Sequence, residues 1–202
     1  MSETALPAPS GLGDTIACVA VDAAGNAVSL IQSLYHEWGS GVVAGETGVV
    51  LQNRGSFFSL DPAHPNGLAP GKRPFHTLTP FMWLAGERPA LIAGTMGGEG
   101  QPQTLAAVAT RVLDFGLDVQ AAVEAPRWVY GRTWGTPSRA LSLEGRFDAG
   151  VAETLRRRGH DVRVLDPWSD TLGPAQAIRW DEARGLWTGA GDPRADGPAL
   201  GA

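Results

Sequence analysis

The sequence has little cysteine, little charge and no long apolar run. The single cysteine, Cys18, excludes a disulfide within the chain and cannot form a zinc cluster by itself. No apolar run approaches the roughly 20 residues that span a bilayer, so we expect no membrane association. The N-terminus lacks the basic and apolar regions of a signal peptide. The cytoplasm is therefore the default expectation, and a signal further upstream would leave a periplasmic or secreted location open.

Charged residues make up only 18% of the 202 residues, and the formal net charge is -5. The basic residues are scattered except for the run at 156–158, which does not resemble a nucleic-acid-binding surface. The sequence has no GxSxG elbow and no P-loop. Its four histidines, His36, His64, His76 and His160, have no metal-ligand spacing. We expect no nucleic acid, no metal and no cofactor. So low a charge content fits either a surface covered by another chain or a large sheet-rich core.

Glycine and proline are abundant, with 27 and 15 residues, and they divide the chain into segments. Residues 1–14 have the composition of a flexible linker, so we predict that the ordered domain spans 15–202. Two apolar runs at 15–22 and 27–34 flank the turn AAGN and predict a β-hairpin. Because both runs are nearly continuously hydrophobic, we expect the hairpin to be covered on both faces.

The remaining segments alternate between hairpins and helices. Residues 77–84 and 89–98 predict a second strand pair around the turn AGER. Helical spacing of Leu105, Val108, Val112 and Leu113 predicts a helix that ends at Gly116. This mixture favours an α+β layered fold over a doubly wound one. Further along we predict a short helix over 118–126, a strand, helix and strand over 139–145, 148–159 and 160–166, and a hairpin over 175–194.

A threonine opens the first predicted strand. Threonine in that place is ordinarily just a β-branched residue suited to a strand. Thr15, however, follows directly on the predicted linker that ends at Asp14. A threonine freed at its N-terminus carries a nucleophilic hydroxyl and an α-amine that serves as its base, so no histidine is required. Thr15 is therefore a candidate nucleophile, exposed by self-cleavage between Asp14 and Thr15.

Gly97 and Gly98 lie between a predicted strand and the helix that follows. Successive glycine amides at a helix N-terminus can donate to a developing oxyanion, and the helix dipole reinforces them. A tight turn is the commoner role of such a pair. The residues alone leave both interpretations open.

Motifs over nearly all of residues 13–194 resemble the small subunit of the γ-glutamyltransferase family. In chain order they are GDT, VDAAGNAVSLIQSLY, GSGVVAGETGVVLQNRG, PGKRPFHTLTP, GTMGGEGQPQ, EAPRW and GAGDPR. The resemblance implies an αββα sandwich of the N-terminal-nucleophile hydrolase type, made as a precursor that cuts itself before Thr15. It further implies that Thr15 forms an acyl-enzyme from a γ-glutamyl or related amide, that Ser33 supports the nucleophile, and that Gly97 and Gly98 form the oxyanion hole.

The glutamyl pocket departs from the pattern of the family. The residues that hold the glutamyl α-amino group correspond here to Tyr35, Arg54 and Phe57, so the acidic partner of the ammonium is absent. The paired serines that bind the α-carboxylate correspond to His76 and Thr77. An ammonium without its carboxylate partner loses about 1.5 to 3 kcal/mol. We therefore expect acyl groups that carry a carboxylate and no free amine, such as glutaryl groups, as in related cephalosporin acylases.

The large subunit of the family is absent from these 202 residues. The resemblance implies that this subunit of the same precursor completes both sheets and supplies an arginine for the substrate carboxylate. We expect it to be the partner of this chain, with a small acyl amide as substrate. The alternative is a fragment without activity, or an interaction module.

Overall fold

The computed structural model describes residues 14–133 and 137–201. Most of the predicted linker, residues 1–13, lies outside the described residues. The chain divides into two compact units. Of the described residues, we call 15–32 and 78–201 the sheet unit, and 33–77 together with Asp14 the loop unit.

The sheet unit is built on a four-stranded antiparallel sheet in the order β3-β4-β8-β9. Strands β3 (Phe81–Ala85) and β4 (Arg88–Thr95) form the hairpin predicted around AGER. Strand β3 begins directly after Pro80, which has no backbone N–H to donate to a ladder. Strands β8 (Ala175–Asp181) and β9 (Leu186–Ala190) form the predicted C-terminal hairpin.

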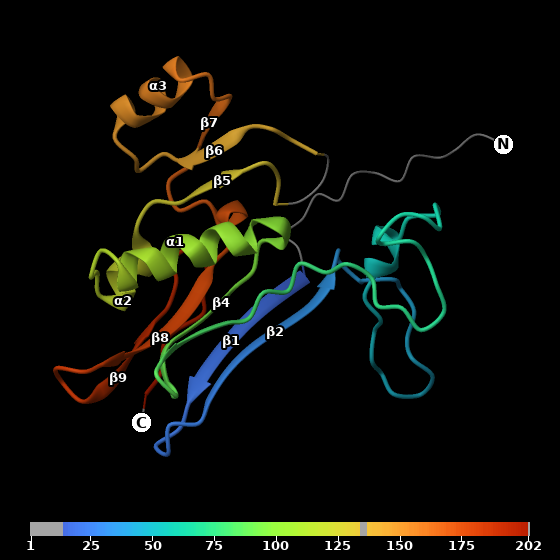
Figure 1. Cartoon of the computed structure of the whole chain (residues 1–202), viewed down its shortest axis with the longest axis horizontal. Helices are drawn as coiled ribbons and strands as arrows, with labels where there is room; N and C mark the ends of the chain where they lie inside the picture. The colour runs from blue at the N-terminus through green and yellow to red at the C-terminus, as the bar shows by residue number, and fades with distance from the viewer. Residues whose placement is uncertain (1–13, 134–136, 202) are drawn as a thin grey trace. The chain divides into compact units, whose positions relative to one another are not determined.

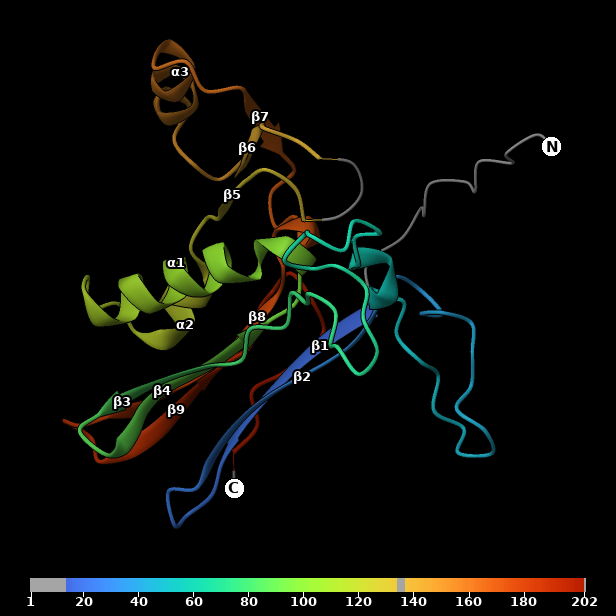
Figure 2. The ribbon, with the colours of Figure 1, turned by 45° about the vertical axis from the view of Figure 1, so that its right-hand side comes forward.

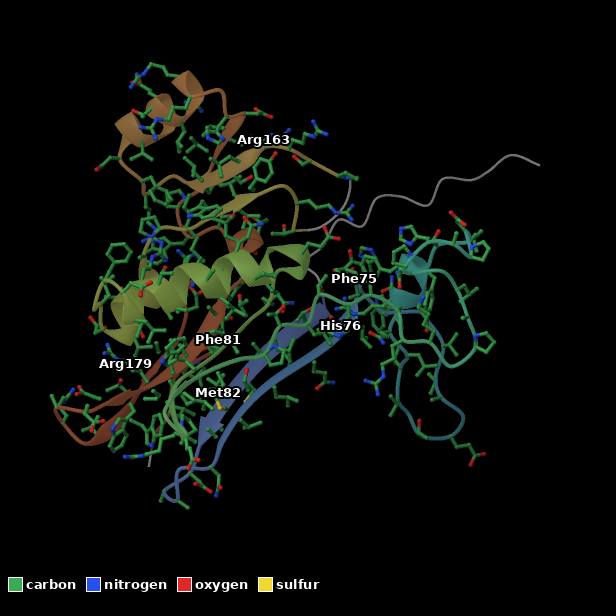
Figure 3. The ribbon with its side chains drawn as sticks, in the orientation of Figure 1. Phe75, His76, Phe81, Met82, Arg163 and Arg179 are labelled. Carbon is green, nitrogen blue, oxygen red and sulfur yellow. The ribbon has the colours of Figure 1, made fainter. Side chains whose placement is uncertain are left out.

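Helices α1 (Gln101–Leu113) and α2 (Val119–Glu124) pack on this sheet (Figure 1). Apolar side chains from both helices interlock with those of β4, β8 and β9. Phe81 packs against this core, whereas its neighbour Met82 is exposed (both labelled in Figure 3). The helical spacing is confirmed for the buried positions of α1, although Leu113 is exposed and α1 ends there rather than at Gly116. The core residues from the helices are Leu105, Val108, Val112, Val119, Ala122 and Val123. No helix of the described residues has the length and apolarity to cross a bilayer.

The hairpin of β1 (Asp14–Val21) and β2 (Ala27–Tyr35) lies against the other face of the sheet (Figure 2). Gly94 on β4 makes this close approach possible, because a Cβ there would lie only 3.0 Å from the Cβ of Ala17. The Ser29 hydroxyl donates to the Ala93 carbonyl at 2.8 Å, which adds a polar link between the two sheets. The sheet unit thus has helical, sheet and sheet layers in succession.

The expectation that this hairpin is covered on both faces is wrong for the described residues. Its side chains alternate between an inner face on β4 and an outer face. The outer face is apolar and exposed, with Ile16 at 62%, Val28 at 48% and Leu30 at 56% exposure. No element of the sheet unit packs over it, so the described residues of this unit form three layers of an αββα sandwich.

A third sheet contains β5 (Trp128–Tyr130), β6 (Leu141–Glu144) and β7 (Val162–Leu165). Strands β6 and β7 are parallel and are joined by α3 (Ala149–Arg157), which confirms the predicted strand, helix and strand. Strand β5 was not predicted. Its three residues are too few for an alternating pattern to emerge.

Candidate active site

Thr15 is the second residue of β1 and is only 3% exposed. The start of β1 lies at the same end of the stacked sheets as the end of β4 (Figures 1 and 2). The contact between Ala17 and Gly94 fixes the two strands against each other near this end. Within the sheet unit, the fold therefore brings the candidate nucleophile to the end of the sandwich from which the Gly97–Gly98 turn emerges.

Gly97 and Gly98 are buried and have φ angles of 106° and 50°, a left-handed conformation that favours glycine. Among the described residues, neither amide donates a hydrogen bond. Buried backbone donors are nearly always paired, so two adjacent exceptions indicate a place for an external acceptor. The expected position needs one correction: the 3₁₀ turn Gly98–Gly100 precedes α1, so these amides do not belong to the first turn of α1.

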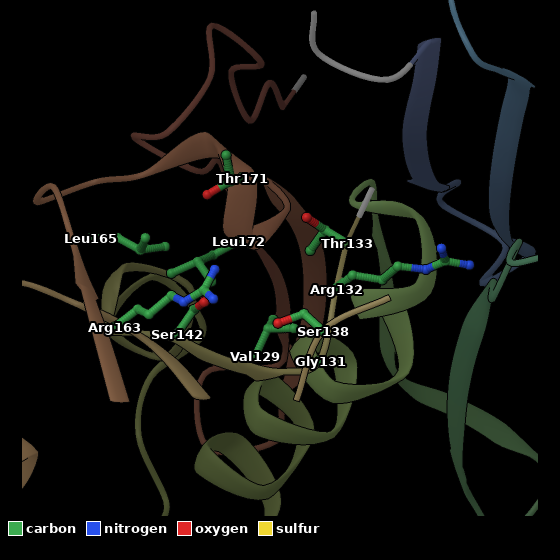
Figure 4. A pocket seen from close by; sticks show the side chains of 10 residues that line it. All are labelled: Val129, Gly131, Arg132, Thr133, Ser138, Ser142, Arg163, Leu165, Thr171 and Leu172. Carbon is green, nitrogen blue, oxygen red and sulfur yellow. The ribbon is translucent and has the colours of Figure 1, made fainter. Parts of the chain in front are cut away.

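An ion pair lies directly beside this turn. Arg132 donates two hydrogen bonds to the carboxylate of Glu99, the residue after Gly98. Arg132, Thr133 and eight further residues line a cavity of about 220 Å³ (Figure 4). The Arg132 side chain points away from the centre of that cavity, whereas Arg163 points toward Ser142. The sequence analysis missed this pair, because nothing in the local pattern links positions 33 residues apart.

Arg54 is the central side chain of the loop unit and is fully buried, with 0% exposure. Its guanidinium donates to the Thr77 hydroxyl and to the Ser33 hydroxyl, both at 2.9 Å. It also lies over the ring of Tyr35, 4.8 Å from the centroid. Burial lowers the pKa of the Arg54 guanidinium, and Tyr35 opposes this shift without outweighing it.

No carboxylate of the described residues forms an ion pair with Arg54. The Arg54 Nε is buried without a hydrogen-bond partner among those residues. A buried charge is ordinarily paired because its desolvation is costly. Arg54 therefore has the properties of a group that receives an anion from outside the described chain.

Further aromatic residues extend from the Tyr35 ring that contacts this guanidinium. The rings of Tyr35 and Phe57 lie 4.8 Å apart, and Phe57 contacts Phe75 edge-on at 5.4 Å. Four of the five predicted substrate-binding residues thus form one group around Arg54, namely Tyr35, Arg54, Phe57 and Thr77, together with Ser33. The fifth, His76, is exposed and has no hydrogen bond to this group among the described residues (Figure 3).

A second set of buried arginines lies in the sheet unit. Arg127 pairs with Asp192 at 2.6 Å, and Arg194 pairs with Asp192 at 2.9 Å and with Glu144. Burial lowers the pKa of Arg127 to about 10, with Asp192 opposing the shift. For Arg194, the partners Glu144 and Asp192 outweigh burial and raise the pKa. Arg127 comes from the motif EAPRW, Asp192 and Arg194 come from GAGDPR, and Glu144 ends β6, so charges far apart in the sequence meet in one cluster. We call these four residues the ion cluster.

Comparison with known proteins connects the chain to one family. Residues 2–202 match the family model described as gamma-glutamyltranspeptidase. Over 188 residues the chain is 53% identical to the glutathione hydrolase-like YwrD proenzyme of Bacillus subtilis (strain 168), covering 93% of this chain and 36% of that protein. Over 191 residues it is 51% identical to the oxamate amidohydrolase proenzyme of Klebsiella pneumoniae, covering 95% and 36%.

Among solved structures, gamma-glutamyltranspeptidase from Pseudomonas nitroreducens superposes with a TM-score of 0.75 at 27% identity. The match covers 94% of this chain and 98% of that one. It confirms the α+β fold of the N-terminal-nucleophile hydrolase type. The chain spans about a third of the length of the curated relatives, 36% in both cases.

Proposed function

The chain belongs to the gamma-glutamyltranspeptidase family, whose members are hydrolase and transpeptidase proenzymes, and we propose that it is the nucleophile-bearing part of an amidohydrolase for amides with a carboxylate on the acyl group. The proposal assigns residues to the nucleophile, to the oxyanion donors and to the acyl pocket. Its main support is Arg54, a buried cation with no carboxylate partner among the described residues.

Thr15 acts twice in this proposal. In self-cleavage its Oγ attacks the preceding carbonyl of Asp14, the peptide C–N bond breaks, and water hydrolyses the resulting ester. This step frees the α-amine of Thr15. In turnover that amine accepts the hydroxyl proton while Oγ attacks the substrate carbonyl, and the proton then passes to the departing amine. Water hydrolyses the acyl-enzyme, or an amine acceptor takes the acyl group instead.

The amides of Gly97 and Gly98 stabilise the tetrahedral oxyanion in both reactions. Their burial and their lack of an acceptor among the described residues support this role. Positioned donors of this kind account for about 10²- to 10³-fold in kcat each.

Arg54 binds the carboxylate of the acyl group, and Thr77 and Ser33 orient its guanidinium. A planar guanidinium suits a carboxylate because it offers parallel N–H donors. An ammonium on the acyl group would be repelled at the same place. Oxamate, the substrate named for the Klebsiella relative, is an amide that carries a carboxylate, which is consistent with this class.

A partner subunit completes the enzyme in this proposal. The chain matches about a third of its relatives, and the outer face of β1 and β2 is apolar and exposed. A partner that covers Ile16, Val28 and Leu30 would add the fourth layer of the sandwich. The same face is the observation that favours the second candidate, an interaction module without catalysis.

Mass spectrometry of the chain, alone and co-expressed with the remaining segment of the Klebsiella relative, tests the self-cleavage. We expect the loss of residues 1–14 from the wild-type chain and an intact Thr15→Ala chain. Thr15→Ser, which keeps a hydroxyl, is the matched control and should still be cleaved. If wild type and Thr15→Ala both stay intact with the partner present, the interaction module becomes the better interpretation.

A pair of chromogenic substrates tests the acyl pocket. Glutaryl-p-nitroanilide and γ-glutamyl-p-nitroanilide have the same length and differ by the α-amino group. We expect kcat/KM to be about ten- to a hundredfold higher for the glutaryl compound, as the loss of one charged hydrogen bond predicts. A preference for the γ-glutamyl compound would contradict the role of Arg54.

A further inference from the structure

The segment 170–174 packs directly against the Gly97–Gly98 turn in the sheet unit. A Cβ on Gly97 would lie 3.0 Å from the Cα of Gly173, and a Cβ on Gly173 would lie 2.2 Å from the Met96 carbonyl oxygen. The two backbones therefore touch with no side chain between them. Any movement of Gly173 must move Gly97 or open a gap beside it.

Buried side chains hold segment 170–174 from several sides. The Met96 amide donates to the Pro174 carbonyl at 3.1 Å, and the Thr95 hydroxyl lies 2.8 Å from the same oxygen. The Thr104 hydroxyl donates to the Leu172 carbonyl at 3.0 Å. The segment is thus tied to both the strand before the Gly97–Gly98 turn and the helix after it.

Arg127 and Asp192 clamp the end of this segment. Arg127 Nη1 donates to the Gly173 carbonyl, and its Nη2 pairs with Asp192. The same Asp192 carboxylate accepts the Ala175 amide at 2.7 Å. One ion pair therefore fixes the backbone on both sides of Pro174.

We propose that the pair of Arg127 and Asp192 is a positioning device for the oxyanion amides, acting through Gly173 on Gly97. This inference rests on the proposed role of Gly97 and Gly98. Arg127 does not touch substrate in this scheme; it sets the position of a backbone donor, and an error of about 1 Å in such a group can cost about a hundredfold in rate. A merely stabilising ion pair would change the amount of folded protein and leave the turnover of the folded enzyme unchanged.

Arg127→Lys is the primary variant and Arg194→Lys is its matched control. Lysine keeps the charge and can pair with Asp192, but its single ammonium cannot also reach the Gly173 carbonyl and the Val123 carbonyl as the guanidinium does. Arg194 belongs to the same ion cluster and its side chain is also buried, yet its contacts are Glu144, Asp192, the Trp168 ring and carbonyls of residues 123–125, none of them in segment 170–174. The two variants differ in their link to Gly97.

An NMR measurement reads the position of Gly97 without any activity. Met96 and Gly97 form the only Met–Gly pair in the sequence, so carbonyl-¹³C methionine combined with ¹⁵N glycine isolates one amide signal. We expect Arg127→Lys to shift this signal and Arg194→Lys to leave it in place. Thr104→Val, which loosens Leu172 by another route, should also shift it and covers the case in which Arg127→Lys does not fold. An unmoved Gly97 signal in the folded variants, or equal shifts in variant and control, overturns the inference.

Kinetics of the assembled enzyme give the second readout. Per titrated active site, Arg127→Lys should lower kcat at least about tenfold with KM changed less than about twofold, because the donor acts on the transition state. Arg194→Lys should keep kcat within about twofold. A shifted Gly97 signal with an unchanged kcat also overturns the inference. If the wild type hydrolyses no amide, the proposed function fails, and the NMR comparison still decides whether Arg127 positions Gly97.

Discussion

Buried guanidinium groups occur in both units of this chain, but their surroundings differ. In the sheet unit, Arg127 and Arg194 meet the carboxylates of Glu144 and Asp192. In the loop unit, Arg54 meets two hydroxyl groups and an aromatic ring. Both sites pay the desolvation of a cation, yet only the first offsets it with charges from the described residues.

This difference in charge balance distinguishes a cluster that stabilises the fold from a proposed binding group. A cluster whose charges are balanced within the chain loses stability when one member is removed, because the remaining charge is left buried and alone. For a buried cation without a carboxylate partner, such as Arg54, the proposed function predicts the opposite: its removal should cost the fold little and ligand binding much. Four measurements test this contrast, in descending order of expected effect.

The largest effect is expected for Glu144→Gln in the ion cluster. Glu144 accepts from Arg194 and from Arg146 and has no exposed side-chain surface. Breaking such a buried pair costs about 3 to 5 kcal/mol of unfolding free energy. Urea denaturation of the 202-residue chain measures it. A loss below about 1 kcal/mol would show that the cluster contributes little to the fold.

Acid should remove the same stabilisation. Burial raises the pKa of the Glu144 carboxyl, but hydrogen bonds and charge from Arg194 outweigh it and leave the pKa below its ordinary value of 4.5. A lowered pKa in the folded state means that the stabilisation is complete above pH 4.5 and is lost as the pH falls from there through the folded-state pKa. Unfolding curves recorded at descending pH should show the gap between wild type and Glu144→Gln narrowing. A gap that stays constant would argue against this assignment.

Arg54→Met should reverse the pattern. Methionine fills a similar volume without a charge, so the unfolding free energy should change by less than about 1 kcal/mol or rise. For a glutaryl amide, loss of the charged contact should raise KM about ten- to a hundredfold. A butyryl amide, which lacks the carboxylate, is the control substrate and should be unaffected. Equal losses for both substrates would place Arg54 among the structural residues.

The smallest effect is expected at an exposed pair. Arg157 and Glu153 lie 4.0 Å apart on α3, with side-chain exposures of 69% and 68%. Solvent screens such a pair, so Glu153→Gln should change the unfolding free energy by less than about 0.5 kcal/mol. The same urea assay supplies the measurement. A change comparable to that of Glu144→Gln would mean that burial does not explain the contrast.

Much of the fold could be predicted from local patterns. The turns AGER and AAGN correctly predicted two hairpins, and the apolar spacing predicted the buried face of α1. Within the sheet unit the outer face of the β1–β2 hairpin is uncovered, contrary to the expectation. Hydrophobicity shows that a strand face favours burial but not which chain buries it. Strand β5 was missed, because its three residues carry no local signal and its pairing with β6 joins positions 11 to 15 residues apart.

In the candidate site, too, the sequence predicted some features and not others. Family motifs pointed to Thr15, Ser33, Gly97, Gly98 and the residues around Arg54, and their catalytic roles stay predictions. The pairing of Arg54 with Ser33 and Thr77 could not be predicted, because it depends on how loops close over 21 and 23 residues. Pairing of Arg127 with Asp192 is likewise a product of the tertiary fold. Sequence motifs marked both residues without revealing what they contact.

The contact of Gly97 with Gly173 also bears on how such a chain can diversify. Any side chain at Gly173 would collide with the Met96 carbonyl, and both glycines have φ angles that other residues rarely adopt. In the proposed enzyme, a new substrate range would then arise through changes at the proposed acyl-pocket residues Tyr35, Arg54 and Phe57. Libraries for directed evolution should keep Gly97 and Gly173 constant and vary Tyr35, Arg54 and Phe57, the positions to which the proposal assigns substrate recognition.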